Sequence, residues 1–200
     1  MRYFLRVRQV LAIAATMIAA AALLIPAGTR SLPLPGLDGM SSLGMPLALF
    51  VPVVIAPALI YGLSAGEPWL EATAARPLPA FDALFAALVA LAALAAYAAV
   101  WLTFGSAWSM YPLGAGRNAL GYVGLALLGR AVLGPRLAGL IPVVAAICVA
   151  LIGFHADGSP RWWAWPVAEA RDEFSWIGAV LILAVGAAVT ASGLSRPISE

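Results

Sequence analysis

The sequence has no lysine, one cysteine and one histidine, and only 10% of its 200 residues are charged. Soluble domains are about a quarter charged and about half apolar, whereas 64% of this chain is hydrophobic. So few charges cannot cover a surface that faces water. The composition therefore excludes a cytosolic enzyme, a nucleic-acid-binding protein and a disordered chain, and it indicates that lipid surrounds most of the polypeptide.

The scarcity of reactive side chains excludes most catalytic and metal chemistry. His155 and Asp157 form a His-x-Asp pair, but two ligands are too few for a zinc site. Cys148 lies in an apolar run, where a free thiol is expected to pack as a small apolar group. A phosphate-binding loop would need a lysine. We therefore expect no enzyme activity, no metal and no cofactor bound by this chain.

Six segments approach the roughly 20 apolar residues that a transmembrane helix needs. We predict an all-α, polytopic integral membrane protein with six transmembrane helices in one domain, residues 1–200. The predicted spans are residues 10–26, 46–63, 83–104, 118–133, 137–154 and 176–194. The first span also fits a signal peptide, but no soluble domain follows it, so we expect it to be retained.

The arginines predict that both termini are cytoplasmic. With the N-terminus inside and six spans, seven arginines lie inside and four outside, as the positive-inside rule favours. Those inside are Arg2, Arg6, Arg8, Arg76, Arg130, Arg136 and Arg196. Those outside are Arg30, Arg117, Arg161 and Arg171. The lack of lysine suggests a GC-rich bacterial genome, so the expected location is the bacterial cytoplasmic membrane.

Charged residues are expected only at the ends of these spans. We expect Arg130, near the end of the fourth span, to extend its side chain toward the membrane surface. No acidic residue falls within a predicted apolar core, which argues against a proton- or ion-coupled transporter.

The three longer loops differ in composition. Residues 28–45 are rich in proline, glycine and serine and are expected to be irregular. Residues 64–79 are predicted to contain a short cytoplasmic helix, because Pro68 suits a first helical position. Residues 156–175 contain three clustered tryptophans, and tryptophan prefers the headgroup region. We expect that outer loop to lie on the membrane surface as one or two short helices.

Small residues dominate one face of the third predicted span. At 100° per residue the face carries a stripe of alanines and continues into Tyr97 and Trp101. This face packs against neighbouring helices, or part of it lines a substrate path with Tyr97 and Trp101 as contacts. Asn118 and Arg117, at the start of the fourth span, either cap and anchor that helix or belong to an outer gate on the same path. The stripe consists of Ala83, Ala86, Ala90 and Ala93.

Three features resemble the membrane subunits of bacterial ABC exporters, and of actinobacterial permeases in particular, which have six helices and a separate ATPase. The first is the short cytoplasmic segment 66–79 between the second and third spans. The second is the fourth span with its flank, Gly116 to Arg130. The third is the long outer loop before the last span, with Arg161-Trp-Trp-Ala-Trp-Pro166.

The resemblance implies a permease subunit that moves a hydrophobic or amphipathic substrate. It implies a second permease subunit, in a homo- or heterodimer, and ATP-binding subunits that hold ATP and magnesium. In that family a coupling helix occupies the position of residues 64–79. The residues expected to contact the ATPase are Glu67, Trp69, Leu70, Glu71 and Arg76.

Two other interpretations remain open. The chain could be a non-transporting membrane scaffold or assembly factor, which would need only helix packing and loops. The short helix in residues 64–79 could lie on lipid, with Trp69 in the headgroups, instead of docking on an ATPase. An adjacent gene for an ATPase, or copurification with one, would separate transport from scaffolding.

Overall fold

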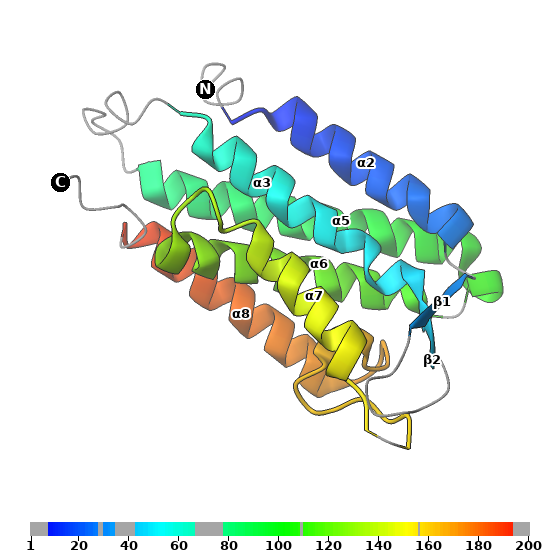
Figure 1. The fold of residues 1–200 in the computed structure, drawn as a ribbon. Coiled ribbons are helices and arrows are strands. Elements are labelled where there is room, and N and C mark those ends of the chain that lie inside the picture. The colour runs from blue at the N-terminus through cyan, green and yellow to red at the C-terminus, as the bar shows by residue number, and fades with distance from the viewer. Residues whose placement is uncertain are drawn as a thin grey trace.

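The computed structural model describes residues 8–27, 30–34, 43–66, 78–108, 110–155 and 157–193. Within them six α-helices run back and forth in one bundle, so the prediction of an all-α fold with six helices is confirmed (Figure 1). The helices are α2 Val10–Ala27, α3 Ile55–Ser64, α5 Leu78–Trp108, α6 Tyr111–Leu133, α7 Leu140–Ile152 and α8 Glu173–Ala191.

Helix α6 forms the centre of the bundle. It contacts α3, α5, α7 and α8, and most of its residues are buried. Its five glycines leave room for the side chains and backbone that pack on it. A β-carbon on Gly124, for example, would lie 2.6 Å from the carbonyl carbon of Ile182 in α8.

Three helices extend beyond the predicted limits. Helix α6 begins at Tyr111 instead of residue 118, because Pro112 occupies the first turn, where no backbone N–H is needed. Helix α5 begins at Leu78 and α8 at Glu173. The α8 start is capped by Asp172, whose carboxylate accepts a hydrogen bond from the Ser175 amide at 3.1 Å.

The second predicted span is only partly α-helical. Two 3₁₀ turns, η1 Leu47–Leu49 and η2 Val51–Val54, precede α3. Pro52 lies in the first turn of η2, and Pro57 lies in the first turn of α3, where its missing N–H costs no hydrogen bond. The second span is therefore a succession of two helix types and not one continuous α-helix.

A small antiparallel hairpin replaces part of the loop that was expected to be irregular. Strand β1 Ser31–Leu34 pairs with β2 Leu43–Pro46, with Ser31 opposite Pro46. The Leu47 amide extends the pairing by donating to the Arg30 carbonyl at 3.0 Å. The hairpin lies at the opposite end of the bundle from the start of α2 (Figure 1).

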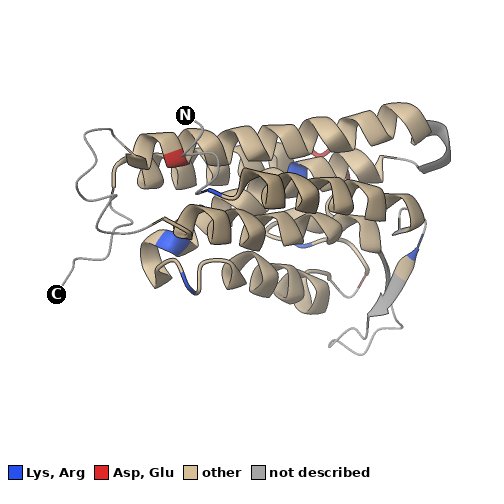
Figure 2. Ribbon diagram, turned by 90° about the horizontal axis from the view of Figure 1, so that it is seen from above, with Lys and Arg blue, Asp and Glu red and all other residues tan. Residues whose placement is uncertain are grey.

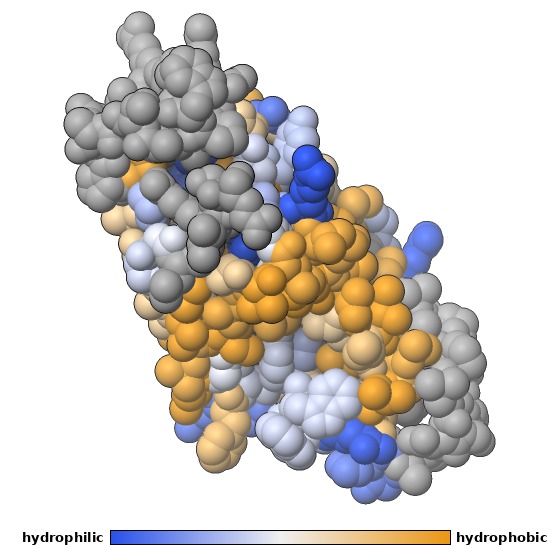
Figure 3. Space-filling model, turned by 60° about the vertical axis from the view of Figure 1, so that its left-hand side comes forward, coloured by the Kyte–Doolittle hydropathy of each residue, from blue (hydrophilic) through white to orange (hydrophobic). Residues whose placement is uncertain are grey.

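The alanine stripe of α5 faces the protein, as its spacing predicts. All four alanines are buried against the core, whereas Leu84, Leu88, Leu91 and Leu102 on the other side are at least half exposed. Exposed large apolar side chains continue over α2, α7 and α8. On the face that Figure 3 shows, hydrophobic residues form a broad band between hydrophilic residues. Figure 2 shows long stretches of helix without any charge.

Within the described ranges, three helices are long and apolar enough to cross a membrane: Leu47–Ser64, Leu78–Phe104 and Glu173–Ala191. Val10–Pro26 and Leu140–Ile152 are shorter apolar helices. Helix α6 is in neither group, although the sequence predicts a span there. Its neighbours enclose it, so its side chains meet protein and can include Gly, Asn and Arg.

Candidate functional site

Two buried arginine clusters are the most polar features of the described interior. We define the Asp82 cluster as Arg8, Asp82, Arg130 and the Leu63 carbonyl. We define the Arg117 cluster as Arg117 and Asn118 with the carbonyls of Leu49, Pro166, Ala168 and Glu169. Arg117 and Arg130 both belong to α6 and are separated by about 20 Å along its axis at 1.5 Å per residue.

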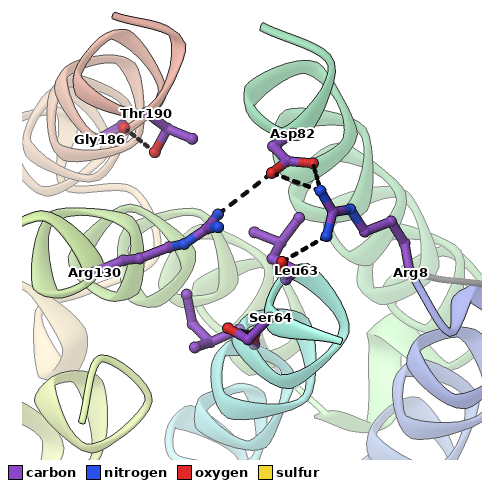
Figure 4. Close-up of polar contacts among 8 residues, drawn as sticks. Arg8, Leu63, Ser64, Asp82, Arg130, Gly186 and Thr190 are labelled. Carbon is purple, nitrogen blue, oxygen red and sulfur yellow. Dashed lines mark hydrogen bonds and ion pairs between the residues drawn. The ribbon is translucent and has the colours of Figure 1, made fainter. Parts of the chain in front are cut away.

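The Asp82 cluster joins four helices or helix ends (Figure 4). One Arg8 nitrogen contacts both Asp82 oxygens, at 2.9 and 3.1 Å, and another donates to the Leu63 carbonyl at 2.7 Å. Arg130 approaches Asp82 from α6 at 3.5 Å. The Arg8 and Asp82 side chains are only 2% and 5% exposed. This network therefore holds the start of α2, the end of α3, the start of α5 and the end of α6 together.

The Asp82 cluster corrects two expectations. Asp82 lies inside α5 and is buried, so one acidic residue does fall within a helix packed in the bundle. Arg130 turns inward toward Asp82, and its side chain is only 14% exposed. The physical reason is charge: a carboxylate among packed helices needs a cation nearby, and two arginines reach it.

The Arg117 cluster fixes the loop that precedes α8. The Arg117 guanidinium donates to the carbonyls of Glu169 at 2.9 Å, Ala168 at 3.1 Å and Pro166 at 3.4 Å. Arg117 is fully buried. These carbonyls lie in the largely irregular backbone before α8, and Arg117 donates a hydrogen bond to each of them. The Asp172 amide also donates to the Glu169 carbonyl.

Asn118 joins the loop before α8 to the 3₁₀ turn η1. Its amide nitrogen donates to the Leu49 carbonyl at 2.9 Å and to the Pro166 carbonyl at 2.8 Å, and its oxygen accepts from Arg117 at 3.3 Å. Both amide donors are thus used within the protein. The side chain binds backbone at the meeting point of η1 and the loop before α8.

The loop before α8 enters the bundle instead of lying wholly on its surface. Within residues 157–172 the structure has one 3₁₀ turn, η3 Trp165–Val167. The Trp165 ring packs on Tyr122 with centroids 5.5 Å apart and fills the space beside Gly121. Trp162 is 93% exposed, whereas Trp163 is half-buried. The three tryptophans therefore have different surroundings, unlike the common interfacial position that the sequence predicts.

The structure places the residues of the predicted substrate path in different surroundings. Tyr97 is buried in the core between α5 and α6, and a β-carbon on Gly116 would touch it. Trp101, one turn later, is half-buried, and Asn118 binds backbone carbonyls. The hydroxyls of Tyr97 and Tyr122 are buried and have no hydrogen-bond partner among the described residues.

The predicted ATPase-coupling residues Glu67, Trp69, Leu70, Glu71 and Arg76 lie outside the described residues. The structure does describe both flanks of their segment. Helix α3 ends at Ser64 and α5 begins at Leu78. Both flanks contact the Asp82 cluster, through the Leu63 carbonyl and Asp82.

The remaining reactive residues lie at the surface. Ser159 donates its hydroxyl and amide to Asp157 at 2.6 and 2.9 Å, and these bonds hold the pKa of Asp157 below its ordinary value. No group of three potential metal ligands occurs within the described ranges. Cys148 is exposed on α7, not packed as expected.

Sequence reasoning missed the Asp82 cluster because its members are far apart in the chain: Asp82 is 74 residues from Arg8 and 48 from Arg130. A signal was present, since Asp82 follows Leu78 by one helical turn and precedes an uninterrupted apolar run. If the third span had been predicted to begin at Leu78 instead of residue 83, Asp82 would have fallen inside that helix.

No protein-family profile, curated protein or solved structure matches this chain.

Proposed function

We propose that this chain is the membrane-spanning subunit of a bacterial ABC exporter that moves a hydrophobic or amphipathic substrate. It crosses the cytoplasmic membrane six times with both termini inside, and a separate subunit hydrolyses ATP. The exposed apolar band supports membrane insertion. The short helix α3 is compatible with spanning, because Asn118 donates a hydrogen bond to the Leu49 carbonyl in the 3₁₀ turn before it. Non-helical backbone at membrane depth is tolerated where it is buried in protein.

The connection between segment 64–79 and the Asp82 cluster carries this proposal. A partner that moved this segment would act directly on Leu63 at one flank and on Asp82 at the other. Through Arg8 and Arg130 the same movement reaches α2 and α6. Packed helices and salt-bridge networks transmit such movements when they have discrete arrangements.

The substrate route in this proposal lies between two copies of the subunit. The interior of one copy is filled by α6, by Trp165 and by the Arg117 cluster. Because side chains fill the interior of one copy, we expect the substrate to pass along the face that two copies share in a dimer.

Copurification with an ATPase tests the proposal. Tagged chain isolated from its own host should bring down a protein with a phosphate-binding loop, and ATP hydrolysis should accompany it. The double variant Trp69→Ala with Glu71→Ala should fold normally but lose that association or its stimulation by substrate. Normal association and hydrolysis in the double variant would exclude segment 64–79 as the coupling element.

Cysteine labelling tests the orientation separately. In a Cys148→Ser background, Trp162→Cys should react with an impermeant thiol reagent from outside the cell, because Trp162 is 93% exposed. Arg136→Cys, exposed at the other end of the bundle, should react only after permeabilisation. The reverse pattern would invert the topology.

A membrane scaffold or assembly factor is the second candidate function. The observation that favours it is the internal use of the polar groups: both amide donors of Asn118 and the Arg117 guanidinium bind backbone. A scaffold would stabilise a partner membrane protein without an ATPase. Deletion of the gene would then lower the abundance of that partner and leave export unchanged.

A further inference from the structure

Trp162 and Phe174 are large aromatic side chains that the rest of the described chain leaves uncovered. Trp162 is 93% exposed and Phe174 is 84% exposed. Trp162 follows the end of α7, and Phe174 lies in the first turn of α8. The end of α7 and the start of α8 lie at the same end of the bundle (Figure 1). Two aromatic rings are therefore presented outward at one end of the molecule.

Hydrogen bonds tie Trp162 to the end of α7. The Arg161 amide donates to the Gly153 carbonyl at 2.8 Å, and the Arg161 Nε donates to the Phe154 carbonyl at 3.0 Å. The Ala164 amide donates to the Arg161 carbonyl at 2.9 Å and closes a turn that contains Trp162. The exposed ring of Trp162 is therefore held beside the end of α7 by a hydrogen-bonded turn.

Trp162 lies where the exposed surface along α7 changes from apolar to polar. Large exposed apolar side chains follow α7 to its end: Val144, Ile147, Leu151 and Ile152. Several residues exposed just beyond that end are polar: His155, Asp157 and Ser159. The bonds of Arg161 to Gly153 and Phe154 hold Trp162 between these two sets.

The start of α8 shows the same change of surface. Arg171 and Glu173 are exposed charged residues at this start. Exposed apolar side chains follow within the helix: Ile177, Val180 and Leu181. Phe174 lies between the charged residues and the apolar ones. Both helices therefore carry an exposed aromatic ring at the boundary between polar and apolar surface.

We propose that Trp162 and Phe174 anchor the ends of α7 and α8 in the headgroup region of the phospholipid bilayer. An indole suits this region, because its ring is apolar and its N–H can donate to a headgroup or water oxygen. The partner is lipid, because the apolar surface that the bilayer surrounds begins at these two rings and continues along both helices. This inference rests on the membrane insertion proposed above, but not on transport or on an ATPase.

Fluorescence quenching by brominated phosphatidylcholine tests the proposal on the full chain in vesicles. One lipid carries bromine near the headgroup, and the other carries it near the bilayer centre. Because the chain has seven tryptophans, the signal of Trp162 is taken as the difference between the wild-type protein and Trp162→Phe, which changes only an exposed side chain. We expect the shallow bromine to quench this signal at least about twofold more than the deep bromine.

Two introduced tryptophans, each in a Trp162→Phe background, supply the matched comparisons. Phe174→Trp should reproduce the preference for the shallow bromine, because this position lies at the same boundary. Ile147→Trp, at an exposed position on α7, lies five residues before Ile152 and therefore about 7 Å deeper along the helix. Its signal should be quenched more strongly by the deep bromine.

Three outcomes would overturn the proposal. Equal or stronger quenching of Trp162 or Phe174→Trp by the deep bromine would place that ring in the hydrocarbon core. No quenching of Trp162 by either lipid would show that water or another protein surrounds it. In both cases, deep quenching of Ile147→Trp would leave membrane insertion standing. Failure of both lipids to quench Ile147→Trp would instead refute membrane insertion, and this inference with it.

Discussion

The guanidinium of Arg8 contacts both carboxylate oxygens of Asp82, although 74 residues separate the two in the chain. Arg8 precedes α2, and Asp82 lies in the second turn of α5. Neither helix is the other's neighbour in sequence. The pair therefore depends on the whole bundle having assembled, and it reports on that assembly.

Loss of the Asp82 charge should destabilise the protein. Asp82→Asn removes the carboxylate that both buried guanidiniums contact, so we expect the free energy of unfolding to fall by about 3–5 kcal/mol. Unfolding in mixed detergent micelles measures it. Asp157→Asn, at an exposed acid, should change it by less than about 0.5 kcal/mol. Similar losses in the two variants would contradict a special role for the buried pair.

Loss of the Arg117 side chain should release the loop before α8. Arg117→Met removes the donors to three loop carbonyls, and we expect a loss of about 3 kcal/mol. Amide hydrogen exchange in residues 165–172 should become faster. Arg171→Met, at an exposed arginine in the same loop, is the control and should leave exchange near the wild-type rate. Unchanged exchange in Arg117→Met would show that packing alone holds the loop.

Removal of the buried tyrosine hydroxyls should not weaken the protein. Tyr97 and Tyr122 have hydroxyls without partners among the described residues, so Tyr97→Phe and Tyr122→Phe should be neutral or more stable by up to about 1 kcal/mol. Tyr61→Phe, at an exposed tyrosine, should be neutral. A loss above about 1 kcal/mol in either buried variant would indicate a hydrogen bond to that hydroxyl.

Two helical glycines should respond in opposite ways to alanine. A methyl group at Gly121 would overlap the Trp165 ring, so Gly121→Ala should cost about 1–3 kcal/mol. Gly178 has no neighbouring atom within 4 Å, so Gly178→Ala should be neutral or stabilise α8 by up to about 1 kcal/mol. Tm measurements in one detergent compare them. A stable Gly121→Ala would mean that Trp165 does not pack there.

The loop carboxylate Asp157 should titrate at an unusually low pH. The Ser159 hydrogen bonds favour its charged form, so its contribution to the turn is present above the ordinary carboxyl pKa and is lost as the pH falls through the lowered value. Ser159→Ala removes the hydroxyl donor and should raise the pKa of Asp157. NMR titration of its carboxyl carbon measures this. An unchanged pKa would assign the shift to the backbone amide instead.

The sequence alone determined the fold class and most helix positions. Six segments with few charges and many apolar residues are visible in the sequence, and in lipid such segments satisfy their backbone polar groups by forming helices, so all six helices were predictable. The alanine stripe of α5 was also predictable, since helical spacing places those residues on one face. The predicted helix limits were less accurate. Helix α6, for example, begins seven residues before the predicted start, because Pro112 fits the first turn of a helix and does not end it.

Only the tertiary structure decided which polar residues meet. Arg117 and Asn118 were noticed in the sequence, but their partners are backbone carbonyls of residues 49 and 166–169, which no side-chain pattern identifies. Asp82, Arg8 and Arg130 come from three separate segments, and each was expected at a surface. Long-range pairing of this kind depends on how helices pack around α6. Local sequence sets which residues can form a helix, whereas the packing sets which charges must neutralise one another.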